Sequence, residues 1–217
     1  MKRALVFFAV AGMMGLLATP AAAADSGWHL RVFAAGFDPD LDVTVPAENP
    51  EFIDVTAESD LGFGASLEYQ FSGLLGLELG VMKASPAIVL SADDVPGYGD
   101  LSLTDSMSTT AIMLDLNFHL TPNSEYFDLY LGGGIASMGY SDLQYAEPDG
   151  DTLNLAIDND LGYSAKAGLG ISLGKNSSWA AFGALRYIWT DLEVTQENSA
   201  TFDFDALSFS VGIAVSF

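Results

Sequence analysis

Apolar and small residues alternate without interruption along the last eleven residues of the chain. Leu, Phe, Val or Ile occupies every second position from Leu207 to Phe217, and Ser, Gly or Ala fills each position between them. Because successive side chains of a β-strand point to opposite faces, this segment is predicted to be a strand with one apolar and one small or polar face. Such a strand suits either the edge of a soluble β-sandwich or the wall of a membrane barrel.

Seven further segments repeat the alternation and decide between these alternatives. Each is long enough for a tilted membrane strand of about 9–11 residues. Beyond the N-terminal segment no apolar stretch approaches the ~18 residues of a membrane helix, and lipid otherwise accepts only closed sheets. We therefore predict an all-β fold, an eight-stranded antiparallel transmembrane β-barrel. The predicted strands are Trp28–Phe37, Leu61–Phe71, Leu75–Lys83, Ser106–Leu120, Phe127–Gly139, Leu161–Leu173, Trp179–Asp191 and the segment that ends at Phe217.

The connections between the predicted strands alternate between short and long. Ser72–Leu74, Thr121–Tyr126 and Gly174–Ser178 are short, and the other four connections run to about 15–23 residues. Short periplasmic turns and long extracellular loops are typical of outer-membrane barrels. An even number of strands then places both ends of the barrel domain on the periplasmic side.

The N-terminal segment has the composition of an export signal. Lys2 and Arg3 precede the apolar run Ala4–Leu17, and Ala21–Ala24 supplies small residues for cleavage. We therefore expect residues 1–24 to be a signal peptide and residues 25–217 to form the barrel domain. The expected location is the bacterial outer membrane after cleavage.

Acidic residues are concentrated in the long connections. The formal net charge is −22, and 23 of the 29 acidic residues fall in these four segments, which contain no Lys or Arg. Nothing there could neutralise phosphates, so nucleic acid is excluded as a partner. The acidic segments are Asp38–Asp60, Asp93–Asp105, Asp142–Asp160 and Asp191–Asp205.

This acidic rim has two interpretations. It is either a solvated surface suited to a saline habitat, or a surface that binds divalent cations and through them the phosphates of lipopolysaccharide. Asp38, Asp40 and Asp42 are the best candidates for a metal site because they stand at strand spacing. No EF-hand spacing is present, so the signal for metal is weak.

Several charged residues fall on lumen-facing positions of the predicted strands. Arg31, Glu68 and Glu78 lie at matching heights on three neighbouring strands, so we expect them to cluster near the inner end of the barrel. Such a cluster is either a structural plug or the constriction of a permeation path. Small inward residues such as Gly168 and Ser210 are expected to accept small polar side chains. The full set of inward charges is Arg31, Glu68, Glu78, Asp115, Asp128, Lys166 and Arg186.

Enzyme chemistry has little support in this sequence. The two histidines, His29 and His119, are both lumen-facing near the inner end, away from the outer rim where a lipid-modifying enzyme would work. A pair such as His119 with Asp115 is better interpreted as structural. No phosphate loop, metal quartet or nucleophile elbow is present. We therefore expect a protein without enzymatic activity and without a cofactor.

Together these segments resemble the OmpW family of small outer-membrane barrels. The first strand carries Arg31 and ends near a proline, as in that family, and the terminal strand is similar to the closing strand of bacterial outer-membrane barrels. The resemblance covers essentially the whole chain after the signal. The segments that carry it are Trp28–Pro39, Leu77–Leu79 with Ala84–Pro86, Phe127–Ile135 and Trp179–Asp191.

The resemblance implies a narrow barrel with an apolar interior path that passes small hydrophobic molecules and opens sideways into the membrane. Phe33, Met82 and Phe182 are the apolar lumen candidates for that path. Arg186 and Lys166 depart from it, since an apolar side chain would suit their positions better. The expected partners are outer-membrane lipid, lipopolysaccharide and small hydrophobic molecules. The competing function is a non-conducting structural or surface-interaction barrel whose acidic loops bind cations, lipopolysaccharide or a partner.

Overall fold

The computed structural model describes residues 26–46, 52–95, 99–146, 152–175, 177–195 and 199–217. The predicted signal peptide, residues 1–24, lies outside these described residues. Within the described ranges no helix is long and apolar enough to cross a bilayer.

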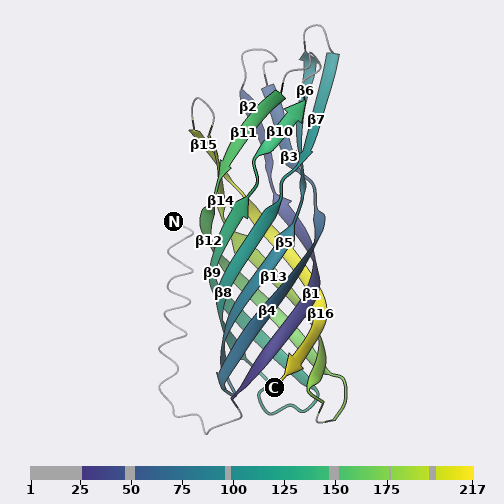
Figure 1. The fold of residues 1–217 in the computed structure, drawn as a ribbon, viewed down its shortest axis with the longest axis vertical. Coiled ribbons are helices and arrows are strands. Elements are labelled where there is room, and N and C mark those ends of the chain that lie inside the picture. The colour runs from purple at the N-terminus through teal and green to yellow at the C-terminus, as the bar shows by residue number, and fades with distance from the viewer. Residues whose placement is uncertain (1–25, 47–51, 96–98, 147–151, 176, 196–198) are drawn as a thin grey trace.

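Eight long strands form a closed barrel, as the alternating sequence predicts (Figure 1). They are β1 (Gly27–Asp40), β4 (Asp60–Ser72), β5 (Leu75–Ala84), β8 (Thr109–His119), β9 (Phe127–Tyr140), β12 (Asp160–Ser172), β13 (Trp179–Trp189) and β16 (Asp205–Ser216). All neighbouring pairs are antiparallel, in the order β1-β16-β13-β12-β9-β8-β5-β4. The barrel closes because β1 pairs with both β16 and β4, so that Arg31 lies opposite Ala214 and Ser66.

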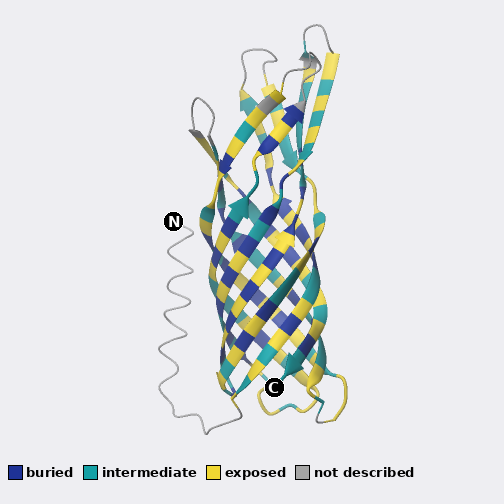
Figure 2. Ribbon diagram, in the orientation of Figure 1, coloured by how far each residue is buried: buried dark blue, intermediate teal, exposed yellow. Residues whose placement is uncertain are grey.

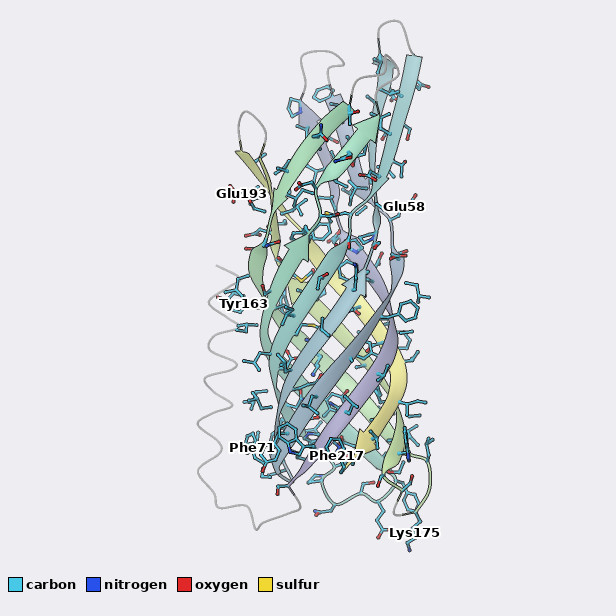
Figure 3. The ribbon with its side chains drawn as sticks, viewed as in Figure 1. Glu58, Phe71, Tyr163, Lys175, Glu193 and Phe217 are labelled. Carbon is cyan, nitrogen blue, oxygen red and sulfur yellow. The ribbon has the colours of Figure 1, made fainter. Side chains whose placement is uncertain are left out.

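Burial alternates along the barrel strands and produces the chequered wall seen in Figure 2. The outward residues are apolar and exposed; Phe63 and Phe209 keep 65% and 56% of their surface. A continuous exposed apolar band of this kind is unfavourable in water and favourable in a bilayer. Figure 3 shows Phe71 and Phe217 together at one end of the barrel, where the short turn before β5 and the end of β16 lie. We call this the inner end.

The long connections continue as strands, a feature that the sequence analysis missed. We call these strands the extension, and they rise above the outer end of the barrel (Figure 1). One sheet has the order β2-β3-β6-β7, with β2 (Asp42–Pro46), β3 (Phe52–Ala57), β6 (Ala87–Val95) and β7 (Gly99–Ser106). The other has the order β10-β11-β14-β15, with β10 (Leu143–Ala146), β11 (Thr152–Asp158), β14 (Asp191–Thr195) and β15 (Ser199–Asp203).

The sequence does contain a signal for the extension. Val43 pairs with Val55, Val55 with Leu90, and Leu90 with Leu103, so that one apolar row crosses the whole first sheet. Polar residues such as Asp42 and Asp54 alternate with them and are exposed. The period of two is therefore the same as in the barrel strands. The high density of acidic residues concealed it.

The extension and the outer half of the lumen share one apolar core. Its side chains come from inward positions of the barrel strands and from the facing sides of the two extension sheets. It includes three fully buried methionines, which fill irregular space well because their side chains are unbranched. The largest fully buried apolar members are Phe37, Met107, Met113, Met138, Tyr145, Ile188 and Phe204.

Five aspartates hold the junction between barrel and extension, where the regular strand pairing is interrupted. Each accepts a hydrogen bond from a backbone N–H that would otherwise lack a partner in the ladder. The bond from Gln144 N to Asp105 Oδ2 is 2.7 Å long and joins the two extension sheets. We call this set the aspartate seam. The other bonds run from Ser85 N to Asp60 (2.6 Å), Ile157 N to Asp142 (3.2 Å), Asp191 N to Asp160 (2.8 Å) and Thr190 N to Asp205 (3.3 Å).

Candidate functional site

Charged and polar side chains fill the inner half of the lumen. The register places Glu68 opposite Glu78 and Glu78 opposite Asp115, so three carboxylates form one row across β4, β5 and β8. Like charges side by side on a sheet repel, and they need cations between them. The cations come from the neighbouring strand β1, which supplies Arg31, and from β12 and β13, which supply Lys166 and Arg186. We call the resulting cluster the ionic floor; its residues are Arg31, Glu68, Glu78, Asp115, Asn117, His119, Asp128, Lys166 and Arg186.

Arg31 joins two members of the carboxylate row. Its Nη2 lies 2.6 Å from Glu68 Oε2 and its Nη1 lies 2.7 Å from Glu78 Oε2. All three side chains are buried, and the guanidinium also lies 5.2 Å from the ring centre of Tyr130. The cluster of Arg31, Glu68 and Glu78 that the sequence suggests is therefore present in the structure.

Lys166 and Arg186 neutralise the rest of the row. Lys166 Nζ lies 2.8 Å from Glu78 Oε2 and 3.1 Å from Asp115 Oδ2. Arg186 holds the same Asp115 through Nη2 at 2.7 Å and donates to Ser164 Oγ from Nη1 at 2.9 Å. These cations come from neighbouring strands, β12 and β13, where they stand opposite each other. The two residues that depart from an apolar path thus form ion pairs with carboxylates from β5 and β8.

Of the two histidines, His119 belongs to the ionic floor. His119 Nδ1 lies 2.8 Å from Asp128 Oδ1 and its Nε2 lies 2.9 Å from Glu68 Oε1. The suggested pair of His119 with Asp115 is wrong, because residues four apart on a strand are separated by roughly 13 Å. His29 contacts Gln70 and Ser216 instead.

Sequence reasoning missed one uncharged member of this site, Asn117. Asn117 Nδ2 donates to Glu68 Oε1 at 3.0 Å and to Glu78 Oε2 at 2.8 Å, and the residue is fully buried. The available signal was its position between Asp115 and His119 on the same face of β8. Because it bears no charge, it did not stand out in a search based on charge.

Of the apolar lumen candidates, Phe33 and Met82 lie outward of Arg31 and Glu78 on their own strands, whereas Phe182 lies inward of Arg186 on β13 and contacts Arg31. The rings of Phe33 and Phe182 meet edge to face at 6.1 Å between centroids, and Met82 is buried close to Ser208. We call Phe33 and Phe182 the aromatic pair. Residues of the aromatic pair and of the ionic floor together line a cavity of about 30 Å³.

Two glycines make room for rings in the lumen. A Cβ at Gly64 would overlap the Phe33 ring, and a Cβ at Gly168 would overlap the Tyr130 ring. The expectation that Gly168 accepts small polar side chains is therefore wrong, because the position is filled from the neighbouring strand. Pairing of an aromatic residue with a glycine opposite allows the ring to lie flat against the wall.

The acidic rim does not assemble the suggested metal site. Asp38 and Asp40 are exposed on the outer surface of β1, and Asp42 is exposed on β2. Across the part of the chain that the structure describes, no group of three or more His, Cys, Asp or Glu residues is placed to hold a metal ion. Carboxylates two residues apart on a strand share a face, but their Cα atoms lie roughly 6–7 Å apart, so a strand alone does not bring several of them around one ion.

The fold is similar to that of solved outer-membrane barrels. The crystal structure of OprG from Pseudomonas aeruginosa has a TM-score of 0.63 at 16% identity, and covers 90% of this chain and 98% of its own. The solid-state NMR structure of AlkL in lipid bilayers has a TM-score of 0.59 at 19% identity, covering 92% and 94%. The crystal structure of Neisserial surface protein A has a TM-score of 0.57 at 11% identity, covering 89% and 100%.

OprG and AlkL are small eight-stranded barrels of OmpW type, so the resemblance noted in the sequence is confirmed at the level of fold. No curated protein matches the chain closely in sequence. The family described as outer membrane protein beta-barrel domain matches residues 8–217, which is nearly the whole chain. The chain therefore belongs to the outer-membrane protein β-barrel domain family.

Proposed function

We propose that this outer-membrane barrel takes up small, mainly hydrophobic molecules from outside through the apolar outer half of its lumen, without covalent chemistry. The observation that carries the proposal is the continuous apolar core that runs from the extension sheets down to Met82 and Phe33. Apolar molecules lose water contact favourably along such a surface. Met82 is flexible, so it is suited to yield to guests of different shape.

The ionic floor argues against an exit along the barrel axis. When a buried ion pair is broken, a charge is left without a partner in a medium of low dielectric constant, and this costs free energy. An apolar guest offers no compensating partner to Arg31 or Lys166. We therefore propose that guests leave sideways into the bilayer, above the floor.

Uptake of a hydrophobic fluorescent probe by cells tests the proposal. Cells that produce the protein should accumulate the probe several-fold faster than cells that lack it. Met82→Arg should remove most of the difference, because it places a charge in the apolar path. Thr104→Arg adds the same charge on an exposed face of β7 and is the matched control. Equal uptake by all four strains would contradict the proposal.

A second candidate function is a non-conducting barrel that acts through its surface. The small size of the lumen cavity, about 30 Å³, favours it. In that case the acidic extension would bind cations, lipopolysaccharide or a partner. Thermal unfolding separates the two functions: calcium chloride should then stabilise the protein more than sodium chloride at equal ionic strength. Equal stabilisation by the two salts would exclude specific cation binding.

A further inference from the structure

Lys83 is the only Lys or Arg on the outward wall of the barrel. The eight barrel strands, which all lie within the described ranges, carry four such residues. Three of them, Arg31, Lys166 and Arg186, point into the lumen and pair with carboxylates there. Lys83 follows Val81 in the outward series of β5 and is exposed. Its charge therefore faces the surroundings of the barrel and not its interior.

Lys83 also differs from the other cations because it has no carboxylate partner. Each of the other four Lys and Arg residues beyond residue 24 forms an ion pair, including the exposed Lys175, which lies 3.8 Å from Glu125. Among the described residues no ion pair involves Lys83, although the chain contains 29 acidic residues. The ammonium group is thus available to an anion that comes from outside the protein.

Lys83 stands where the outward wall changes from apolar to polar. Toward the inner end the outward residue before it is the exposed Val81, and toward the outer end the next one is the exposed Ser85. Opposite Lys83 lie the exposed Phe63 on β4 and Thr110 on β8. Just beyond this level β5 leads into β6 of the extension (Figure 1). The upper edge of an apolar band is the level of the lipid headgroups, to which a lysine side chain extends its charge.

The surrounding charges restrict the ligand at this level. An ammonium group only donates hydrogen bonds, so its partner is an oxygen acceptor, and an anionic one binds best. Asp38 and Asp40 are exposed on β1, which only β4 separates from β5, and they would repel an anion there. A phosphate monoester carries a charge of about −1.5 to −2 at neutral pH, so Lys83 attracts it more strongly than a singly charged phosphodiester.

We propose that Lys83, with its neighbours Phe63, Ser85 and Thr110, forms a binding site for a phosphate monoester of lipopolysaccharide on the outward wall. The ammonium group pairs directly with a phosphate of the lipid A part, without a bridging divalent cation. The hydroxyl-bearing Ser85 and Thr110 lie beside the sugars, and an acyl chain packs against Phe63. The site lies outside the lumen, so it is independent of the proposed uptake function.

Binding of lipid A to the full protein in detergent micelles, measured by native mass spectrometry in the presence of EDTA, tests the proposal. Lipid A is compared with dephosphorylated lipid A, which has the same sugars and acyl chains. The wild type should bind the phosphorylated form roughly fivefold more tightly, as expected for one lysine that faces an anionic headgroup. Lys83→Met keeps an unbranched apolar side chain but removes the charge, so it should bring this ratio close to one. Lys83→Arg should retain most of the preference.

Lys175→Met is the matched control, because it removes an exposed lysine from a turn at the inner end and should leave the ratio unchanged. Lys83→Met has no ion pair to lose, and each variant is first checked for the folded, heat-modifiable form. Equal binding of the two lipids by the wild type, or an unchanged ratio in Lys83→Met, overturns the site.

Competition with phosphatidylglycerol separates the two sources of lipid phosphate. An equimolar amount of this phosphodiester lipid should displace only a minority of the lipid A bound to the wild type. Displacement of half or more would overturn the assignment of the site to lipopolysaccharide.

Discussion

The inner and outer halves of the lumen are filled by opposite chemistry. In the inner half Arg31, Lys166 and Arg186 hold a row of carboxylates in buried ion pairs. In the outer half, methionine, phenylalanine and alanine side chains merge with the core of the extension. The difference shows that one barrel can combine a surface for apolar guests with a barrier to ions. The apolar side chains and the ion pairs occupy different stretches of the barrel axis.

The carboxylates of the two regions also have different roles. Glu68 and Glu78 in the floor are buried and face cations. Asp160 and Asp205 in the aspartate seam accept backbone N–H groups near the membrane surface. An acidic residue in the floor is thus part of an ion pair, whereas one in the seam replaces a missing strand partner. This contrast leads to predictions of unequal size.

The largest effect is expected in the floor. Glu68→Ala removes the partner of Arg31, Asn117 and His119 and leaves a buried positive charge. The free energy of unfolding should fall by roughly 3–5 kcal/mol, measured by urea titration in lipid vesicles. The exposed Glu58, at the base of the extension in Figure 3, gives the control: Glu58→Ala should stay within about 0.5 kcal/mol. Similar losses in both variants would remove the distinction between the regions.

A slightly smaller effect is expected on the wall. Leu114 points outward from the middle of β8, next to the inward Met113. Leu114→Arg should lower the unfolding free energy by ~2–4 kcal/mol, because a charge would face hydrocarbon. Thr104→Arg on the extension should have little effect in the same vesicles. If the two variants behaved alike, the bilayer would not surround β8 at this height.

Coupling within the floor should be smaller again but measurable. A double-mutant cycle of Arg31→Met with Glu78→Gln isolates their interaction from the rest of the network. We expect a coupling of about 1–3 kcal/mol, since the charges are in direct contact in a buried site. A coupling near zero would mean that the register of β1, β4 and β5 differs from the one described.

The smallest effect is expected in the aspartate seam. Asp160→Ala leaves the backbone N–H of Asp191 and the hydroxyl of Thr190 without their acceptor, at a cost of about 1–2 kcal/mol. The loss should be local, so amide exchange at Asp191 should quicken while exchange at Glu78 in the barrel stays slow. Equal acceleration at both sites would show that barrel and extension open together.

The barrel could be predicted from the sequence because its signal is repeated and local. The alternation from Leu207 to Phe217 follows from the two faces of a single strand, so it can be recognised within one segment. Eight such segments are enough to form a closed barrel. The extension was missed although Val43, Val55 and Leu103 alternate in the same way. Its strands are short and rich in carboxylates, and its stability comes from pairing between distant segments, which no local pattern reveals.

The candidate site could be predicted only for residues whose charge and position along the strand were enough to identify their neighbours. Arg31, Glu68 and Glu78 could be grouped because their positions on neighbouring strands match. The partner of His119 could not, because it depends on the diagonal neighbours across β8 and β9. The close approach of Tyr130 to Gly168 likewise depends on side-chain packing between strands.

The central claim is that the lumen consists of an apolar chamber above a closed ionic floor. Ion conduction by the purified protein in planar lipid bilayers tests this claim most directly. The wild type should carry no steady ion current, because Arg31, Lys166 and Arg186 close the axis with ion pairs. It should remain silent under the conditions in which cells take up the hydrophobic probe. A stable ohmic conductance in the wild type would contradict the closed floor and show that the axis is open.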